Sequence, residues 1–210
     1  AAPQLLLPPA ALAAHERGEP DVDDRRVLLL EPGGALLQCA LGDDRPGTSL
    51  QPRPVPAFAL LRALYSKTVA AVAVGGGHVL ALCVGASATE VLSWGCGDEG
   101  QLGHGARESE AHPRTVSKFQ GKGASAVACG ARHSVVIAGG AAYTCGAGDS
   151  GQLGLGDAKT QAYPRRVALG TGAARLLLAA GGGRHTLLVD ARGAVHACGC
   201  GSSGQLGTGL

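Results

Sequence analysis

The sequence predicts an all-β fold made of repeated units of short strands joined by tight turns. Of its 210 residues, 35 are glycine, more than twice the usual share of about 7%. Long helices are disfavoured, because each interior glycine costs about 0.5–1 kcal/mol relative to alanine. Hydrophobic residues still make up 45% of the chain, which is enough for a packed core. The third observation is a glycine-rich segment that occurs three times.

This segment has the pattern GxGxxGQLGxG and recurs at offsets of 51 and 53 residues. Successive glycines can adopt positive φ without a Cβ penalty, so each copy predicts a long turn. An active site needs its groups only once, so the residues that recur are interpreted as structural. They are Gly95, Gly97, Gly100, Gln101, Leu102, Gly103, Gly146, Gly148, Gly151, Gln152, Leu153, Gly154, Gly199, Gly201, Gly204, Gln205, Leu206 and Gly207.

One period, residues 91–141, divides into four short strands. The first is Val91–Trp94, and the second begins at Pro113, since proline is tolerated at the first position of a strand. Ala124–Cys129 and Ser134–Ile137 are the third and fourth strands. The pair Gly139-Gly140 then predicts a two-residue hairpin turn. Four strands in about 50 residues are typical of one blade of a β-propeller.

The repeat divides the chain into five parts. Residues 1–24 form an irregular segment, and residues 25–90 form a degenerate repeat region in which Ala35–Cys39 aligns with the repeated strands. Residues 91–141 and 142–194 are each predicted to form a blade, and residues 195–210 to begin a further one. A GxxH pattern also recurs, at His78, His133 and His185. We expect these histidines to be buried and hydrogen-bonded.

Together, the glycine turns, the PxxV segments at Pro52, Pro113 and Pro164 and the GxxH-Ser/Thr pairs resemble the regulator of chromosome condensation repeat family. Trp94 occupies the family's usual Trp-Gly position, where Cys145 and Cys198 stand in the other copies. The resemblance covers about residues 25–210 and implies a seven-bladed propeller, which needs roughly 350–400 residues at this period. This chain holds about three and a half repeats. We therefore expect a longer chain or a partner to complete the ring.

Charge and cysteine content exclude several classes of function. Lys plus Arg is 18 and Asp plus Glu is 16, so the chain has no basic footprint for nucleic acid. Seven cysteines are interpreted as free thiols in a reducing compartment, which predicts an intracellular protein. The cytoplasm is the first expectation, and an organelle or the nucleus stays open. The uncharged stretch Thr68–Thr89 has the length of a membrane span. Glycines in its middle favour two strands and a turn, so no membrane span is expected.

No cofactor, metal site or catalytic set is expected. Gly95, Gly97 and Gly100 match the dinucleotide fingerprint formally. That pattern occurs three times, however, and lacks the amphipathic helix that a nucleotide site needs. Cys198 and Cys200 have no second pair at zinc spacing, so metal binding is not favoured. No Ser-His-Asp or Cys-His relay can be singled out, and the protein is not expected to be an enzyme.

The predicted function is a non-catalytic scaffold that binds protein partners through loops. Residues that differ between copies are the better binding candidates, although the same charges could simply form a solvated face. The resemblance implies two alternatives: a nucleotide exchange factor for a small GTPase, as the founding member is for Ran, and the substrate-recognition part of a ubiquitin ligase. The plant ultraviolet photoreceptors of this fold need a cluster of tryptophans, which one Trp excludes here. The candidate partner-binding residues are His104, Arg107, Glu108, His112, Arg114, Lys118, Lys122, Leu155, Asp157, Lys159, Arg165, Arg166 and Thr208.

Overall fold

The computed structural model describes residues 26–30, 36–40, 64, 67–85, 88–170 and 174–209. This part of the chain is built from strands, with one short 3-10 helix, η1, at Ser117–Phe119. None of its helices is long and apolar enough to cross a membrane. The strands are β1 (Arg26–Leu30), β2 (Leu36–Ala40), β3 (Thr68–Val74), β4 (His78–Val84), β5 (Thr89–Gly95), β6 (Glu110–Thr115), β7 (Ala124–Cys129), β8 (His133–Ala138), β9 (Ala141–Gly146), β10 (Gln161–Arg166), β11 (Leu176–Gly181), β12 (His185–Asp190) and β13 (Val195–Gly199).

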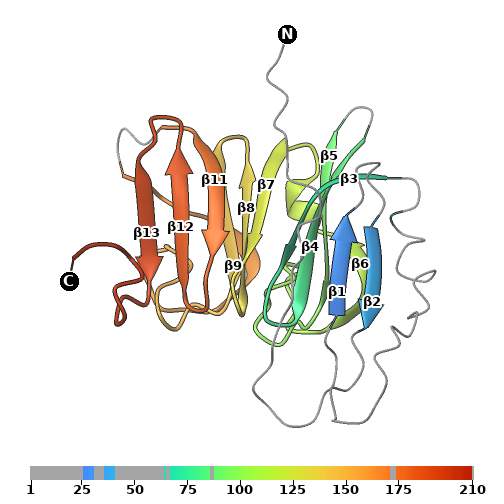
Figure 1. Ribbon diagram of the computed structural model, residues 1–210, viewed down its shortest axis with the longest axis horizontal. Coiled ribbons are helices and arrows are strands. Elements are labelled where there is room, and N and C mark those ends of the chain that lie inside the picture. Colours follow the sequence, from blue (N-terminus) through green and yellow to red (C-terminus); the bar gives the residue numbers. More distant parts are fainter. Residues whose placement is uncertain are drawn as a thin grey trace.

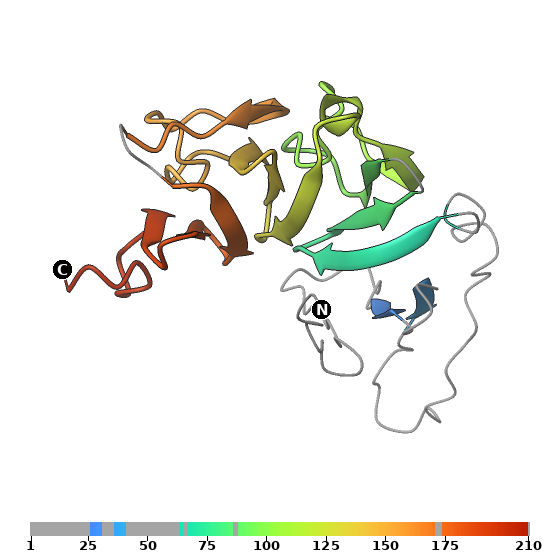
Figure 2. The same ribbon diagram turned by 90° about the horizontal axis from the view of Figure 1, so that it is seen from above.

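The strands form antiparallel sheets that follow one another in an arc (Figures 1 and 2). We call β3-β4-β5-β6 the first sheet, β7-β8-β9-β10 the second and β11-β12-β13 the third. The inner strands β3, β7 and β11 lie side by side, and the other strands of each sheet extend outward from them. This arrangement confirms the predicted β-propeller fold class.

The sequence period does not coincide with the sheets. The predicted unit 91–141 contains β5 and β6 of the first sheet and β7 and β8 of the second. The reason is the Gly139-Gly140 turn, whose φ values of 58° and 78° close a tight hairpin between β8 and β9. A two-residue hairpin keeps both strands in one sheet, so the boundary between sheets lies instead at η1, between β6 and β7. The predicted boundary between residues 141 and 142 therefore falls inside the second sheet, after the first residue of β9.

Pro113 differs from its predicted position. It was expected to open a strand, but it is the fourth residue of β6, which begins at Glu110. Pro164 holds the same place in β10. Both strands are the outermost of their sheets, where a residue without an N–H leaves no gap in the hydrogen-bonded ladder.

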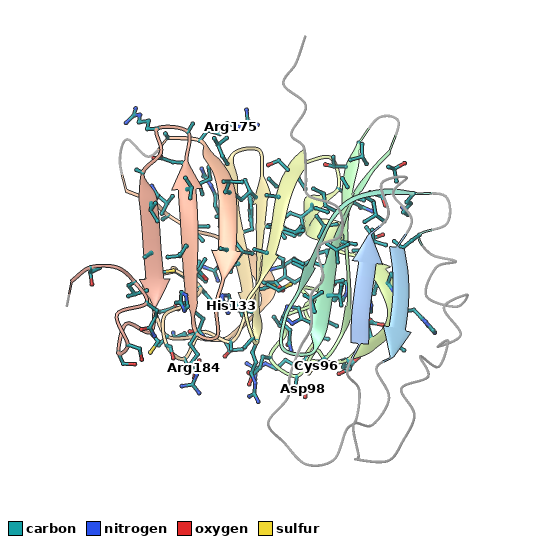
Figure 3. The ribbon with its side chains drawn as sticks, in the orientation of Figure 1. Cys96, Asp98, His133, Arg175 and Arg184 are labelled. Atoms are coloured by element: carbon teal, nitrogen blue, oxygen red, sulfur yellow. The ribbon has the colours of Figure 1, made fainter. Side chains whose placement is uncertain are left out.

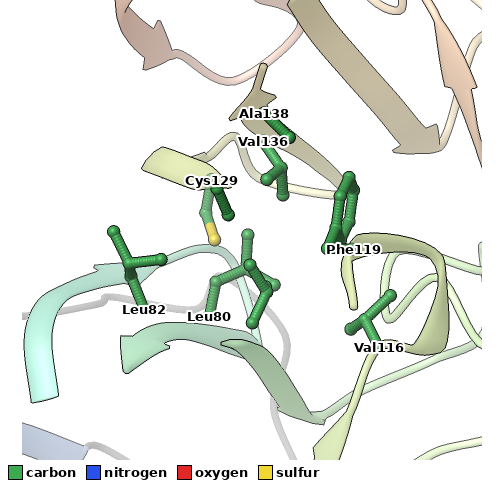
Figure 4. Close-up of a cluster of buried hydrophobic side chains, with 9 residues drawn as sticks. Leu80, Leu82, Val116, Phe119, Cys129, Val136 and Ala138 are labelled. Atoms are coloured by element: carbon green, nitrogen blue, oxygen red, sulfur yellow. The ribbon is translucent and has the colours of Figure 1, made fainter. Parts of the chain in front are cut away.

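The core lies between successive sheets. Leu80, Leu82 and Val91 of the first sheet pack against Cys129 and Val136 of the second, and η1 adds Phe119 to the cluster (Figure 4). An equivalent cluster joins the second and third sheets through Val135, Ile137, Ala142, Leu176 and Leu188. Burial of each large aliphatic side chain stabilises the fold by about 1.5–3 kcal/mol. Packing between sheets is thus the main apolar contact of the fold.

The earlier part of the chain is described only in part. The strand predicted from the degenerate copy at Ala35–Cys39 corresponds to β2, which pairs with β1. The stretch Thr68–Thr89 forms β3 and β4 and the first residue of β5, so the two predicted strands are confirmed. Residues 1–24 and the first PxxV segment at Pro52 lie outside the described residues.

Candidate functional site

The GxxH pattern places a histidine ring directly over a glycine. The Gly75 N–H donates to the His78 carbonyl at 2.8 Å, and a Cβ on Gly75 would lie 2.4 Å from the His78 ring. The same substitution at Gly130 or Gly182 would bring a Cβ to 2.0 Å from the following histidine ring. No side chain larger than hydrogen fits at these glycines without moving the imidazole.

His78 links the first sheet to the second through a hydroxyl group. Its Nε2 lies 2.9 Å from Ser134 Oγ, and Ser134 Oγ donates to the main-chain carbonyl of Gln101 at 2.7 Å. All three residues are buried. A serine hydroxyl has one hydrogen, which the Gln101 carbonyl accepts, so His78 Nε2 must carry the proton that Ser134 Oγ accepts.

The second and third sheets repeat this connection. His133 Nε2 lies 2.8 Å from Thr186 Oγ1, and Thr186 Oγ1 donates to the Gln152 carbonyl at 2.7 Å. We call this chain of groups, from histidine to hydroxyl to glutamine carbonyl, the relay. Each relay connects residues more than 30 positions apart in the sequence and satisfies polar groups that burial would otherwise leave unpaired.

Burial keeps both relay histidines neutral. Loss of solvation and the nearby His133 lower the pKa of His78 from 6.5 to about 3. Loss of solvation and the nearby His185 lower the pKa of His133 to about 4. In each ring Nδ1 is buried without a hydrogen-bond partner, so a second proton would be placed where nothing accepts it. Neither imidazole is a general acid or base at neutral pH.

Removal of a relay hydroxyl is expected to destabilise the fold. Ser134→Ala and Thr186→Val each leave a buried imidazole N–H and a buried carbonyl unpaired, so we expect each to cost about 1–3 kcal/mol. Urea unfolding at pH 8 measures the loss. Ser125→Ala is the matched control, since Ser125 is exposed and its hydroxyl makes only a long contact of 3.4 Å with the Ile137 carbonyl. Equal stability of Ser134→Ala and Ser125→Ala would contradict the relay.

The Gln-Leu pair of each glycine turn has both side-chain and main-chain roles. Gln101 Oε1 accepts the Glu99 N–H at 2.9 Å, and Gln152 Oε1 accepts the Ser150 N–H at 2.8 Å. The Leu102 carbonyl accepts from Ser93 Oγ at 2.7 Å. The side chains of Leu102 and Leu153 are buried, so the QLG residues of the first two turns hold the turn and supply the carbonyl of the relay.

The cysteines at the tryptophan position are packing residues with weakly acidic thiols. Trp94 and Cys145 are buried, and Cys145 Sγ lies 3.6 Å from the Gln101 carbonyl. Burial raises the pKa of the Cys145 thiol to about 12 and also raises the pKa of Cys198. The thiolate is the nucleophilic form, so burial disfavours the reactive form of both groups at neutral pH. Within the described ranges, no group of three or more His, Cys, Asp or Glu side chains could hold a metal ion.

One end of the sheets carries charged residues that the relays do not use. We define the turn end as the glycine turns 95–105, 146–156 and 199–209, the loops 106–109 and 157–160 that follow two of them, and the GxxH loops 130–132 and 182–184. Cys96, Asp98 and Arg184 lie at this end in Figure 3. Arg132 Nη1 lies 3.6 Å from Glu99 Oε1, so an ion pair joins two successive sheets.

The loops after the glycine turns are part of the turn end. Ser109 Oγ accepts the Gly97 N–H at 3.1 Å and is 3.4 Å from Asp98 Oδ1. The Lys159 N–H donates to Asp157 Oδ1 at 3.3 Å. Sequence reasoning missed Arg132 and Arg184, which lie on the same end. The sequence pattern that could have indicated them is GxRH, which occurs in two copies, whereas the first copy has Gly77 in place of the arginine.

The structure does not bring the thirteen predicted partner-binding residues together in one patch. Those at the turn end are His104, Arg107, Glu108, Leu155, Asp157, Lys159 and Thr208. His112, Arg114, Arg165 and Arg166 lie on the outermost strands β6 and β10. Lys118 lies on η1, and Lys122 is near the Gly139-Gly140 hairpin at the opposite end, where the Gly139 N–H donates to the Gly123 carbonyl.

Several of these side chains are already engaged. His104 is half-buried, with Nε2 3.0 Å from Ser93 Oγ, and burial lowers its pKa. Arg114 pairs with Glu110 on its own strand. Lys122 Nζ lies 5.7 Å from the centre of the Tyr143 ring, and Leu155 packs against the cluster between the second and third sheets. Arg107, Glu108, Asp157 and Lys159 are exposed in the loops.

Radially arranged antiparallel sheets joined by buried histidine–hydroxyl relays define a β-propeller of repeated blades. The family model for the regulator of chromosome condensation (RCC1) repeat matches residues 90–137 and 139–189. The chain belongs to the RCC1 repeat family, as the resemblance of its motifs predicted.

Two curated relatives have 37% identity to this chain. Human E3 ubiquitin-protein ligase HERC2 aligns over 194 residues, which cover 89% of this chain and 4% of HERC2. The ultraviolet-B receptor UVR8 of Arabidopsis thaliana aligns over 150 residues, which cover 71% of this chain and 33% of the receptor. The chain thus spans at most one third of either relative.

Two solved structures share the fold. Human WBSCR16 has a TM-score of 0.65 and 21% identity, covering 83% of this chain and 44% of the other. Prp20p from Saccharomyces cerevisiae, whose structure was described with its binding to Gsp1p and histones, has a TM-score of 0.63 and 21% identity, covering 84% and 42%.

Proposed function

We propose that this chain is a non-catalytic interaction segment of a propeller and binds a protein partner through its turn end. One observation carries the proposal. The recurring histidines and glutamines of the first two copies are buried in the relays, while the charged groups that vary between copies are exposed on the loops after the glycine turns. Variable exposed loops on a rigid repeated scaffold are typical of binding surfaces.

The charge of the turn end favours a protein partner. Acidic and basic side chains are mixed there, with Glu108 next to Arg107 in one loop and Asp157 two residues before Lys159 in the other. A mixed surface lacks the basic stripe that nucleic acid requires. The six described cysteines are free thiols, which supports a reducing compartment, and we propose the cytoplasm.

Charge exchange tests the proposed surface. We expect a variant carrying Arg107→Glu, Glu108→Arg, Asp157→Lys and Lys159→Glu to lose at least tenfold in affinity for a partner captured by the wild-type chain, because these four loop charges are reversed while the net charge is kept. The matched variant Lys118→Glu/Lys122→Glu alters the opposite end. Surface plasmon resonance compares the three chains. Loss of binding only in the opposite-end variant would place the site away from the loops.

A small GTPase is a partner class to test, because Prp20p was studied for binding to Gsp1p. We expect this chain not to accelerate release of labelled nucleotide from a panel of small GTPases. The loops between β5 and β6 and between β9 and β10 are occupied by the repeated turns, which leaves no sizeable wedge there. Accelerated release of nucleotide from any GTPase would contradict the scaffold function and would show that the chain acts as an exchange factor.

A second candidate is partner recognition within a ubiquitin ligase. The alignment with HERC2 covers 89% of this chain, and human HERC3, another probable E3 ubiquitin-protein ligase, is 34% identical over 82% of it. When the chain is fused to a ligase catalytic domain, we expect ubiquitin to be transferred to the captured partner, and the charge-exchanged loop variant to abolish transfer. Equal transfer by both fusions would argue against recognition through the turn end.

A further inference from the structure

Cations gather at the end of the sheets opposite the turn end. We define the hairpin end as the Gly139-Gly140 hairpin, η1 with the turn 120–123 that follows it, the last residue of β10 and residue 175, which precedes β11. Arg175 lies at this end in Figure 3, opposite to Arg184 and Asp98 at the turn end. The basic group of the hairpin end consists of Lys118, Lys122, Arg166 and Arg175, which are exposed except for the half-buried Lys118.

Gly140 gives the side chain of Arg175 a fixed place beside the hairpin. A Cβ on Gly140 would lie 2.5 Å from Arg175 Cγ and 3.3 Å from Arg175 Nε, so the stem of the arginine lies directly against the glycine. The Leu176 N–H donates to the Gly140 carbonyl at 2.9 Å, which fixes the main chain next to Arg175. A side chain that is already held in place loses less rotamer freedom when it binds a ligand.

Tyr143 positions two further cations of the group. Lys122 Nζ lies 5.7 Å from the centre of the Tyr143 ring, and this ring packs edge-on against Phe119 with 5.6 Å between the ring centres. Arg166 is paired with Tyr143 in the register of β10 and β9, and residues directly opposite each other in an antiparallel pair point to the same face of the sheet. Lys122 and Arg166 therefore lie beside one anchored aromatic ring.

The basic group has no carboxylate partner in the described part of the chain. The nearby acids are already engaged: Glu90 pairs with Lys67, and Asp190 accepts two main-chain N–H groups of its own turn, at 2.9 and 3.0 Å, and lies 3.4 Å from His196 Nε2. Most other described acids lie at the turn end, namely Asp98, Glu99, Glu108, Asp149 and Asp157. An acidic ligand would therefore supply the counter-charge that the hairpin end lacks.

We propose that the hairpin end binds an extended segment of a protein partner that is rich in Asp and Glu, whose carboxylates pair with the basic group. Guanidinium groups pair with carboxylates through two parallel hydrogen bonds, and successive side chains of an extended peptide reach both Arg175 and the cations beside Tyr143. Duplex nucleic acid needs a longer basic stripe than this group provides. The site lies at the opposite end from the turn end, so it is independent of the function proposed for the loops.

Charge removal tests the site with a defined peptide. The probe is a fluorescein-labelled peptide of alternating Asp and Glu residues, and binding is followed by fluorescence anisotropy. We expect Lys122→Gln/Arg175→Gln to bind it at least tenfold more weakly than the wild type, and the charge-matched control Arg107→Gln/Lys159→Gln at the turn end to keep the wild-type affinity. Equal weakening in both variants would overturn the proposal, because net charge alone would then explain binding. An absence of binding by the wild type would also overturn it.

A charge-preserving variant separates the loss of charge from damage to the fold. Lys122→Arg/Arg175→Lys should recover most of the affinity that the glutamine variant loses, and no recovery would overturn the proposal. All of these substitutions are at exposed positions, so we expect each thermal midpoint to stay within about 2 °C of the wild type.

Competition identifies the class of ligand. Unlabelled peptide, a short DNA duplex and phosphatidylcholine vesicles with one third phosphatidylserine are compared at equal concentrations of negative charge. We expect the peptide to displace the probe at the lowest concentration. Displacement at a lower concentration by the duplex would assign the hairpin end to nucleic acid, and by the vesicles to a membrane surface. Either result would overturn the proposal.

Discussion

Gly97→Ala and Gly148→Ala are each expected to destabilise the chain by about 3 kcal/mol. A Cβ at Gly97 would lie 1.8 Å from the Glu108 carbonyl oxygen, and one at Gly148 would lie 2.2 Å from the Lys159 carbonyl oxygen. Both obstacles are main-chain atoms in the loop that returns to the outermost strand, so neither can move without displacing that loop. Urea unfolding of purified variants measures the loss.

The third copy provides the matched control. Gly201 holds the same position in its turn, but a Cβ there would meet only the end of the Leu206 side chain, at 3.1 Å. We expect Gly201→Ala to cost less than about 1 kcal/mol, because a flexible side-chain end can move aside. Equal losses at Gly97, Gly148 and Gly201 would show that glycine is needed there for a reason other than the returning loop.

A shift from pH 8 to pH 5 is expected to lower the free energy of unfolding by about 4 kcal/mol through the two relay histidines. Their pKa values are about 3 for His78 and about 4 for His133 in the folded chain, against about 6.5 when unfolded. At pH 5 the unfolded chain binds a proton at each histidine and the folded chain does not. Each site therefore costs about 2 kcal/mol at that pH.

The lowered pKa values of the two histidines determine the pH range over which the free energy of unfolding changes. Stability is complete above pH 6.5, falls as the pH drops below that value, and stops falling on account of these groups near pH 3–4. Urea unfolding at several pH values measures the slope. The variant His133→Gln, whose longer amide can still donate to Thr186 from the position of Nε2, should show only about half of this loss of stability. The control His112→Gln, at an exposed position, should show all of it. A full loss of stability in His133→Gln would contradict the assignment.

The sequence predicted the recurring parts of this fold because repetition reveals them. The glycine turns, the Gly139-Gly140 hairpin and the burial of His78 and His133 all follow from residues that occur at one period. The partners of the histidines were not predicted, because each hydroxyl lies 53 or 56 residues away in the next sheet. A sequence period marks which residues repeat and leaves open which of them meet across an interface.

The position of the boundary between sheets could not be predicted from the repeat pattern either. A period can be divided at any point, and only the pairing of β8 with β9 shows that residues 91–141 straddle two sheets. The turn end was predicted in part. Variable loops indicated Arg107 and Asp157, but the ion pair between Arg132 and Glu99 joins loops of different sheets, and its geometry depends on how those sheets pack.

A double-mutant cycle on His133 and Thr186 tests most directly whether the relay joins successive sheets. The free energies of unfolding of the wild type, His133→Leu, Thr186→Val and the double variant are measured in urea at pH 8. We predict a coupling energy of about 1–3 kcal/mol, with the double variant losing clearly less than the sum of the two single losses. Losses that add to within about 0.5 kcal/mol would show that the two side chains act independently and would contradict the relay.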